Sequence, residues 1–360
     1  MKSNGSKSTS RILYIDILRV VSVFAVVLLH TSAPLVEDLY ISGSKIWWIG
    51  NIIDSATRWC VPVLIMVSGR LMLCSKREME ISSFLKGRLR KILIPLLVWS
   101  FIYMAWYGDI SPKLDISVIT LFIRNFYEGN VHVHLWYLYM LVGLYLITPI
   151  IKTYVNNTDS CNLKYFIMIW FIANGIIGFL EKFIEARTDF NLSFFHWSIG
   201  YYVLGFFLCK QNISKKIVNI LYVAGIIGLM ITIYATYILT KNNDGILVPH
   251  FYSYFSPNVI FMSISIFLLF RNINWKRVID KKNWLNKLIL NLSNKSFGIY
   301  LVHLLVLDNI LLKIIKIPIN TRYVYIGGEI FLVTMLTFLI SYFIVAALQK
   351  IPLLRNIVPK

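Results

Sequence analysis

Three ionisable residues interrupt the first long apolar stretch of the chain. Residues 12–30 read ILYIDILRVVSVFAVVLLH and contain Asp16, Arg19 and His30. A helix turns by about 100° per residue, so Arg19 and His30, eleven residues apart, fall within about 20° of each other. Asp16 lies about 60° from Arg19 on the same face. Ionisable groups at membrane depth cost about 3 kcal/mol each and usually mark a functional interior.

His30 is suited to acid–base chemistry, because an ordinary histidine titrates at about pH 6.5 and exchanges a proton at neutral pH. At the end of its helix, it would deprotonate a hydroxyl group that arrives from outside the membrane. The alternative is a histidine that ends the helix at the level of the lipid headgroups. Asp16 and Arg19 are close enough in sequence to form a structural ion pair, or Arg19 offers its guanidinium to a phosphate or carbonyl group.

A second acid–base pair, Asp54 and Arg58, lies in the apolar stretch 46–73. Two such pairs predict a polar cavity between helices, and a structural ion pair is again the alternative. Farther along the same stretch, Ser68 precedes Gly69, and small residues of this kind favour close packing of helices. We therefore expect Ser68 to support the cavity or the packing beside it.

The segment that follows is strongly basic and ends in Arg88, Arg90 and Lys91. Such a cluster either sets the orientation in the membrane and contacts lipid headgroups, or binds the phosphates of an anionic cofactor. We name these three residues as candidates to bind a donor molecule.

Histidines and aromatic residues lie in two later stretches. His134 and Trp136 begin the fourth apolar stretch, where Trp136 fits an interfacial aromatic belt or a surface on which a sugar stacks. His132 and His134 are two residues apart and would not share a helical face, so they argue weakly for a metal site. Tyr300 and His303 are one helical turn apart and are candidates to line the cavity.

The composition shows what must position these residues. Of 360 residues, 58% are hydrophobic and only 15% are charged, with a mean hydropathy of +0.68. This predicts an all-α, polytopic membrane protein. The net charge of +19 fits basic cytoplasmic loops better than a nucleic-acid partner. The four cysteines are scattered, so neither a disulfide framework nor a metal site is expected.

About ten apolar stretches are long enough to span a bilayer. They are 12–30, 46–73, 92–108, 133–151, 164–180, 192–209, 217–239, 251–270, 296–315 and 324–348. The second is long enough to be tilted or broken at Pro62, and the longest connections, 109–132 and 271–295, are expected to be loops. Lys and Arg concentrate on the side of the N-terminus, which predicts that both termini are cytoplasmic. The organisation expected is a tail at 1–11, a transmembrane domain at 12–348 and a tail at 349–360.

Five stretches, in this order, resemble signatures of the membrane-bound acyltransferase-3 family. They read IDILRVVSVFAVVLLHT, RWCVPVLIMVSGRLML, FLKGRLRKILIP, HLWYLYMLVGLYLITPI and SFGIYLVH. The first contains the family's R-x10-H spacing, in Arg19 and His30. Two positions depart from the family pattern: Arg70 stands where an aromatic or apolar residue is usual, and Lys91 where a second arginine is common. The likeness is to single-domain members that O-acetylate surface glycans.

The resemblance implies a membrane O-acyltransferase in the bacterial cytoplasmic membrane. Such an enzyme takes an acetyl or other short acyl group from cytoplasmic acyl-CoA, usually acetyl-CoA, and passes it to a hydroxyl group of a cell-envelope polysaccharide. His30 would be the general base or accept the acyl group first, with Asp16 and Arg19 in the same catalytic set. Arg19 and Arg58 would orient His30, stabilise negative charge or hold the donor. Membrane lipid, acyl-CoA and a glycan are the expected partners, and no metal is expected.

Two other classes of function stay open from the residues alone. A transporter or flippase for a glycan or an anionic substrate would also place charges along a path through the membrane, but no inverted repeat is visible in the sequence. A membrane sensor or assembly factor would bind an acyl donor without turnover.

Overall fold

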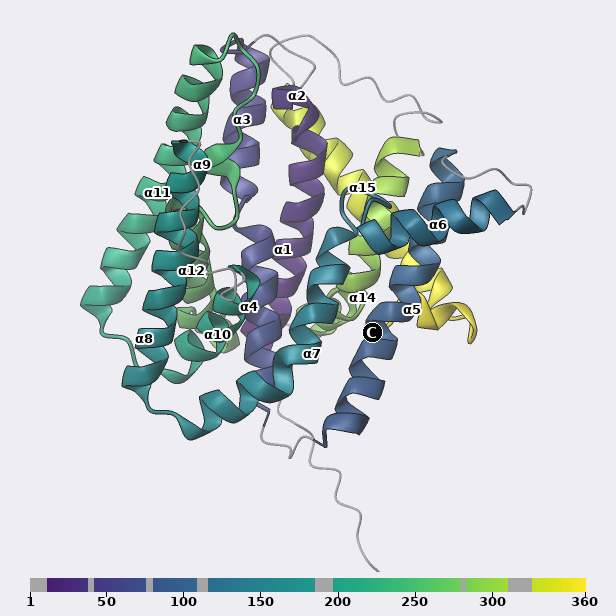
Figure 1. The fold of residues 1–360 in the computed structure, drawn as a ribbon, viewed down its shortest axis with the longest axis horizontal. Coiled ribbons are helices and arrows are strands. Elements are labelled where there is room, and N and C mark those ends of the chain that lie inside the picture. Colours follow the sequence, from purple (N-terminus) through teal and green to yellow (C-terminus); the bar gives the residue numbers. More distant parts are fainter. Residues whose placement is uncertain are drawn as a thin grey trace, which may run out of the picture.

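The computed structural model describes residues 12–37, 42–75, 80–108, 116–184, 197–279, 283–309 and 326–360. Every regular element in these ranges is a helix, which confirms the predicted all-α class (Figure 1). Nine helical spans within them are long and apolar enough to cross a membrane. The sixth predicted stretch, 192–209, is described only from residue 197, as a shorter apolar helix.

The elements follow one another along the chain as helices of very different lengths. They are α1 (Leu13–Ser32), α2 (Pro34–Glu37), α3 (Lys45–Thr57), α4 (Cys60–Leu73), α5 (Ile81–Tyr107), α6 (Ile116–Glu128), α7 (Trp136–Asn157), α8 (Ser160–Trp170), the π-helix η1 (Phe171–Ile177), α9 (Gly178–Phe183), α10 (Trp197–Lys210), α11 (Lys215–Asn242), the 3-10 helix η2 (His250–Tyr252), α12 (Pro257–Asn272), α13 (Trp275–Ile279), α14 (Asn283–Leu305), α15 (Ile326–Leu348) and the 3-10 helix η4 (Leu354–Asn356).

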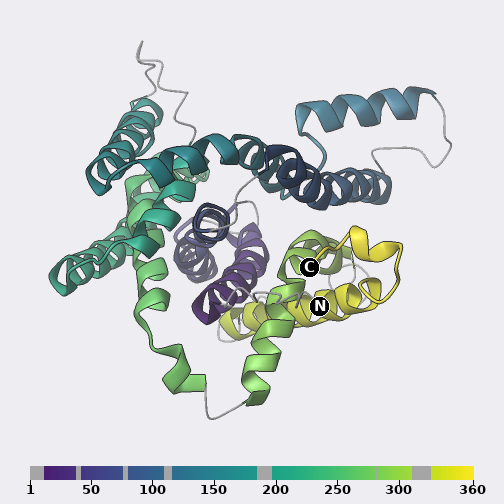
Figure 2. The same cartoon turned by 90° about the horizontal axis from the view of Figure 1, so that it is seen from below.

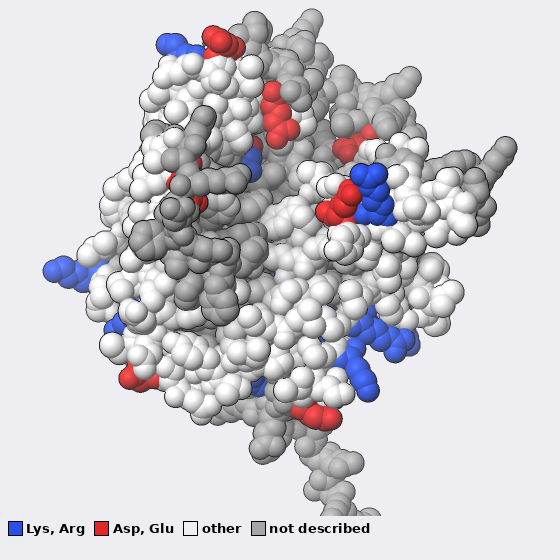
Figure 3. Space-filling view, in the orientation of Figure 1, with Lys and Arg blue, Asp and Glu red and all other residues white. Residues whose placement is uncertain are grey.

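Helix α1 lies at the centre of the bundle. It packs against α3, α4, α12, α14 and α15, and Figure 2 shows α1, α3 and α4 enclosed by later helices. Leu18 and Val27 on α1 are fully buried. The ionisable face of α1 therefore meets other helices rather than lipid. The broad face in Figure 3 is almost free of charge, and Lys and Arg gather near the first half of α5.

The second apolar stretch is broken, one of the two outcomes expected at Pro62. Helix α3 ends at Thr57 and α4 begins at Cys60. A proline has no amide hydrogen, and its ring clashes with the carbonyl group four residues earlier, here that of Arg58. The break turns the chain at Arg58, so this arginine sits at a junction between two helices.

Glycines allow α4 and α10 to pack with their backbones in contact. A Cβ atom on Gly69 would lie 1.9 Å from the carbonyl oxygen of Tyr202, and one on Gly205 would lie 2.0 Å from that of Met66. The close packing expected from the Ser68–Gly69 pair is confirmed and depends on Gly69.

The sequence predicts loops at 109–132 and 271–295, but both connections contain helices. Segment 109–132 contains the 13-residue helix α6, whose side chains are mostly exposed. Segment 271–295 contains α13 and the first turns of α14. Helix α6 is stabilised by an apolar face that packs on α5, where the rings of Phe122 and Phe101 lie with their centres 6.0 Å apart.

Candidate active site

Two cavities lie near opposite ends of α1. We call the first the Arg19 cavity, because Arg19 lines it together with residues of α4, α5, α7 and α14; its volume is about 290 Å³. The second, the His30 cavity, measures about 600 Å³ and is lined by His30, Arg58, His134 and Trp136. Tyr300 on α14 lines both. The predicted site residues are thus divided between two chambers that meet at one tyrosine.

The Arg19 cavity is basic. Its charged lining residues, among those that the structure describes, are Arg19, Arg88, Lys91 and Lys360, with no Asp or Glu. Arg88, Arg90 and Lys91 are all exposed, but Arg90 is not in the lining, because two residues along a helix turn its side chain about 200° away from that of Arg88. Two of the three predicted donor-binding residues therefore reach this cavity and the third faces elsewhere.

Asp16 and Arg19 meet through a hydroxyl group from another helix. Ser293 on α14 donates a hydrogen bond to Asp16 Oδ1 at 2.7 Å and accepts one from Arg19 Nη1 at 3.5 Å. Asp16 is buried, so this contact also satisfies part of its hydrogen-bonding capacity. Ser293 could not be identified from the sequence, because a serine in an apolar helix is common and carries no signal of its own.

Ser68 lies on the wall of the same cavity. Its hydroxyl donates to the carbonyl oxygen of Leu64, one turn earlier in α4, at 3.0 Å. Tyr137 and Tyr145 on α7 also line this cavity. The lining beside the basic residues is therefore mixed in polarity.

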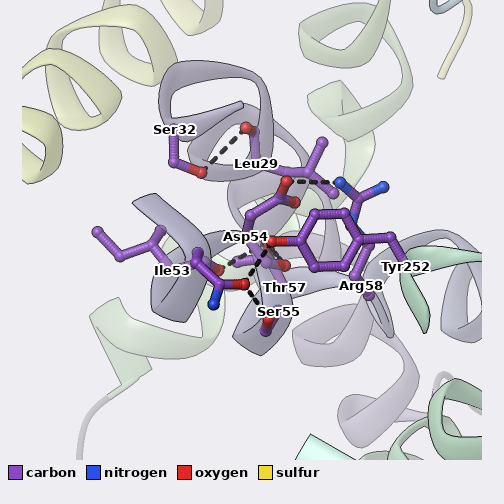
Figure 4. Close-up of polar contacts among 9 residues, drawn as sticks. Leu29, Ser32, Ile53, Asp54, Ser55, Thr57, Arg58 and Tyr252 are labelled. Atoms are coloured by element: carbon purple, nitrogen blue, oxygen red, sulfur yellow. Dashed lines mark hydrogen bonds and ion pairs between the residues drawn. The ribbon is translucent and has the colours of Figure 1, made fainter. Parts of the chain in front are cut away.

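The pair Asp54–Arg58 holds one side of the His30 cavity. Arg58 Nη2 donates to Asp54 Oδ2 at 2.5 Å, and the side chain of Asp54 is fully buried (Figure 4). The guanidinium carbon of Arg58 lies 4.1 Å from the centre of the Tyr252 ring, and the Tyr252 hydroxyl donates to Asn51 Oδ1 at 2.6 Å. Stacking and pairing hold the guanidinium in a fixed place. Asp54 and Arg58 form an ion pair, and Arg58 also lines the cavity. The structural role and the cavity role expected from the sequence therefore apply to the same pair.

Four of the six histidines of the chain form a connected group. The ring centres of His30 and His303 are 5.2 Å apart, and those of His303 and His134 are 5.3 Å apart. His134 Nδ1 lies 2.9 Å from Nδ1 of the fourth member, His132. His132 and His134 lie in the turn before α7 and not within a helix, so helical spacing does not keep their rings apart. No three His, Cys, Asp or Glu side chains in the described ranges are placed to hold a metal ion.

The ring of His303 has a defined orientation. Its Nδ1 lies 2.5 Å from the carbonyl oxygen of Tyr300, and a carbonyl oxygen only accepts, so Nδ1 carries the proton. Nε2 of His303 is then an acceptor; it is buried and has no hydrogen-bond partner among the described residues. His303 is not in the lining of the His30 cavity but lies behind His30. It is therefore placed to support His30 rather than to contact a substrate.

Aromatic rings complete the His30 cavity. Trp136 stacks on Tyr254 with ring centres 5.8 Å apart, and both residues line the cavity. The Tyr300 hydroxyl donates to the backbone carbonyl of His134 and so ties α14 to the turn before α7. A planar aromatic surface beside a histidine and an arginine is suited to hold a sugar ring while one of its hydroxyl groups reacts.

Comparison with known proteins gives one match. A family model described as an acyltransferase domain matches residues 12–348 of the chain. No curated protein and no solved structure matches. The matched range includes every residue named above as a candidate for the site, apart from Lys360.

Proposed function

Because the chain belongs to the acyltransferase 3 family, which transfers acyl groups, we propose that it moves an acetyl or other short acyl group from cytoplasmic acyl-CoA to a hydroxyl group of an extracytoplasmic cell-envelope or surface polysaccharide. The chain is a multi-pass membrane protein. The proposal adds that the membrane is the bacterial cytoplasmic membrane and that both termini face the cytoplasm.

One observation carries this proposal: a basic cavity and a histidine-containing, aromatic cavity meet at Tyr300. Acyl-CoA is a multiply charged phosphate compound with a long, thin arm that ends in the reactive thioester. A basic chamber suits the phosphates, and the meeting of the two chambers at Tyr300 would let the arm reach from one into the other. A glycan is neutral or weakly charged at the reacting sugar and stacks on aromatic rings. The two chambers therefore match the two substrates in chemistry.

The donor would enter at the Arg19 cavity. Arg88 and Lys91 near its mouth would bind the phosphates, and Arg19 would contact the arm or the thioester carbonyl. Asp16 holds Arg19 in place through Ser293. The thioester would then pass Tyr300 toward His30. The helical rise between Arg19 and His30 is about 16 Å, a distance that an extended thioester arm has to span.

The chemical step would take place in the His30 cavity. His30 removes the proton from the acceptor hydroxyl group, and the oxygen attacks the thioester carbonyl carbon. The resulting oxyanion lies near the guanidinium of Arg58, which stabilises its charge. The carbon–sulfur bond breaks, the ester remains on the glycan, and the CoA thiolate takes up the proton to leave as CoA. The variant in which His30 first carries the acyl group uses the same residues in two steps.

The test is a transfer assay with the purified protein in lipid vesicles. Labelled acetyl-CoA and envelope glycan are supplied, and the glycan is analysed by mass spectrometry for the mass and position of the added group. We expect the mass of the glycan to increase by about 42 daltons for each acetyl ester formed. An equal amount of CoA should be released. Movement of glycan across the vesicle membrane without acyl-CoA would instead favour a transporter, and donor binding without product would favour a sensor.

A further inference from the structure

The segment after α15 folds back onto the bundle. Residues 349–360 lie outside the range matched by the family model. The indole nitrogen of Trp99 on α5 donates to the carbonyl oxygen of Ile357 at 2.9 Å. The side-chain amide of Gln349 donates to the backbone carbonyl oxygen of Val358, also at 2.9 Å. Val358 is fully buried. The tail expected at 349–360 is therefore a docked part of the fold.

A glycine on α14 makes room for this docking. A Cβ atom on Gly298 would lie 3.2 Å from the Cβ of Val358 and 2.6 Å from a methyl group of Val345 on α15. Gly298 is two residues before Tyr300, so the docked tail packs close to the junction of the two cavities. A side chain at residue 298 would clash with Val345 and crowd Val358, so this packing depends on the glycine.

Docking brings the next two residues to the Arg19 cavity. Pro359 and Lys360 are both in its lining, beside Arg88 and Lys91. The tail thus supplies one of the four basic residues of this cavity, among those that the structure describes. Arg355 and Lys360 are both exposed, but Arg355 is not in the lining. The position of Lys360 is therefore set by Trp99, Gln349 and Val358 and is not a general property of a basic tail.

We propose that Lys360 is a phosphate-binding residue of the donor site, held there by the docked segment 349–360. The proposal rests on the proposed function, because it takes the phosphate to be that of acyl-CoA. A charge-assisted hydrogen bond to phosphate is stronger than a neutral one. Because Lys360 is exposed and one of several basic residues in the lining, we expect its removal to weaken donor binding at most about tenfold rather than abolish it.

The experiment measures the dissociation constant of CoA for the whole chain in phosphatidylcholine vesicles. Lys360→Glu should raise this constant about tenfold, and Lys360→Arg, which keeps the charge, should leave it within about twofold of the original value. Arg355→Glu is the matched control, because it makes the same change of charge in the same segment. Trp99→Phe, which keeps the ring and removes the donor to Ile357, should weaken CoA binding in the same direction but less.

Three outcomes would overturn the proposal. If Lys360→Glu binds CoA like the unchanged chain, the lysine has no role at the donor site, although the proposed function stands. If Arg355→Glu weakens CoA binding as much as Lys360→Glu does, the effect is one of general charge. If the difference appears only when phosphatidylglycerol is added to the vesicles, the phosphate bound is that of a lipid headgroup. Failure of the unchanged chain to bind CoA would overturn the proposed donor as well, and that result is distinct from the other three.

Discussion

The two cavities near the ends of α1 handle charge in opposite ways. In the His30 cavity, Arg58 is paired with the buried carboxylate of Asp54 at 2.5 Å and is covered by the ring of Tyr252. In the Arg19 cavity, several basic side chains share a lining in which no described residue is acidic. Both contain arginine, yet only one presents an excess of positive charge to a ligand.

This difference separates binding from chemistry. An unbalanced group of cations attracts a polyanion and contributes mainly to affinity. A paired and stacked arginine is held in one position, which is the requirement for stabilising a charge that develops during reaction. Substitutions in the Arg19 cavity should therefore weaken donor binding. Substitutions in the His30 cavity should lower the rate at which the bound complex reacts.

The largest effect is expected from His30→Ala. Removal of a general base lowers kcat by about 10²- to 10⁴-fold, while the dissociation constant of CoA should stay within about twofold because His30 is not in the Arg19 cavity. Steady-state kinetics and CoA binding measure the two quantities separately. His250→Ala is the control, because His250 lines neither cavity. Full activity of His30→Ala would show that His30 is not the general base of the reaction.

The next largest effect is expected from Asp54→Asn. The change leaves the buried guanidinium of Arg58 without its counter-charge and should lower the free energy of unfolding by about 3 kcal/mol. Glu128→Gln is a matched comparison, because Glu128 forms an ion pair of the same i, i+4 spacing with Arg124, at 3.0 Å, on the exposed helix α6. That change should lower the free energy of unfolding far less, because solvent screens an ion pair between exposed side chains. Thermal unfolding in detergent compares the two, and equal losses would show that the Asp54–Arg58 pair is no more than a surface contact.

A smaller effect is expected from reversing charges in the Arg19 cavity. Arg88→Glu should raise the KM for acetyl-CoA about tenfold with little change in kcat, because the residue contributes to binding and not to the chemical step. Arg90→Glu is the control, since Arg90 lies two residues away on α5 but outside the lining. If Arg90→Glu had the same effect, the donor would be attracted by the charge of α5 as a whole.

The smallest effect is expected from Ser293→Ala. The change removes one hydroxyl that donates to Asp16 and accepts from Arg19. A net contribution of about 1 kcal/mol corresponds to a change of about fivefold in donor affinity. We expect a modest rise in the KM for acetyl-CoA and an unchanged kcat. A loss of kcat as large as that of His30→Ala would place Arg19 in the chemical step and would end the separation between the two cavities.

Local patterns in the sequence were enough to predict the face of α1. The positions of Asp16, Arg19 and His30 follow from helical periodicity, and the break before Pro62 follows from the chemistry of proline. Helical phase also separates Arg88 and Lys91 from Arg90, but only once α5 is known to be helical through the basic segment.

Contacts between distant segments could not be predicted in the same way. Ser293 reaches Asp16 across 277 positions of sequence, and Tyr252 reaches Asn51 across 201. The contact of His132 with His134 could not be predicted from helical spacing, because the chain forms a turn there. The docking of Val358 depends on a space left by Gly298, and such complementarity of shape has no signal in a single sequence.

The central claim, that the donor and the acceptor occupy different cavities and the acyl group passes between them at Tyr300, is tested most directly in sealed vesicles of one orientation. Labelled acetyl-CoA is enclosed on the side of the Arg19 cavity, and the glycan is supplied on the side of the His30 cavity. The account predicts labelled glycan outside, unlabelled CoA inside, and no transfer when the two substrates exchange sides. Transfer that occurs only when donor and acceptor are on the same side of the membrane would contradict it.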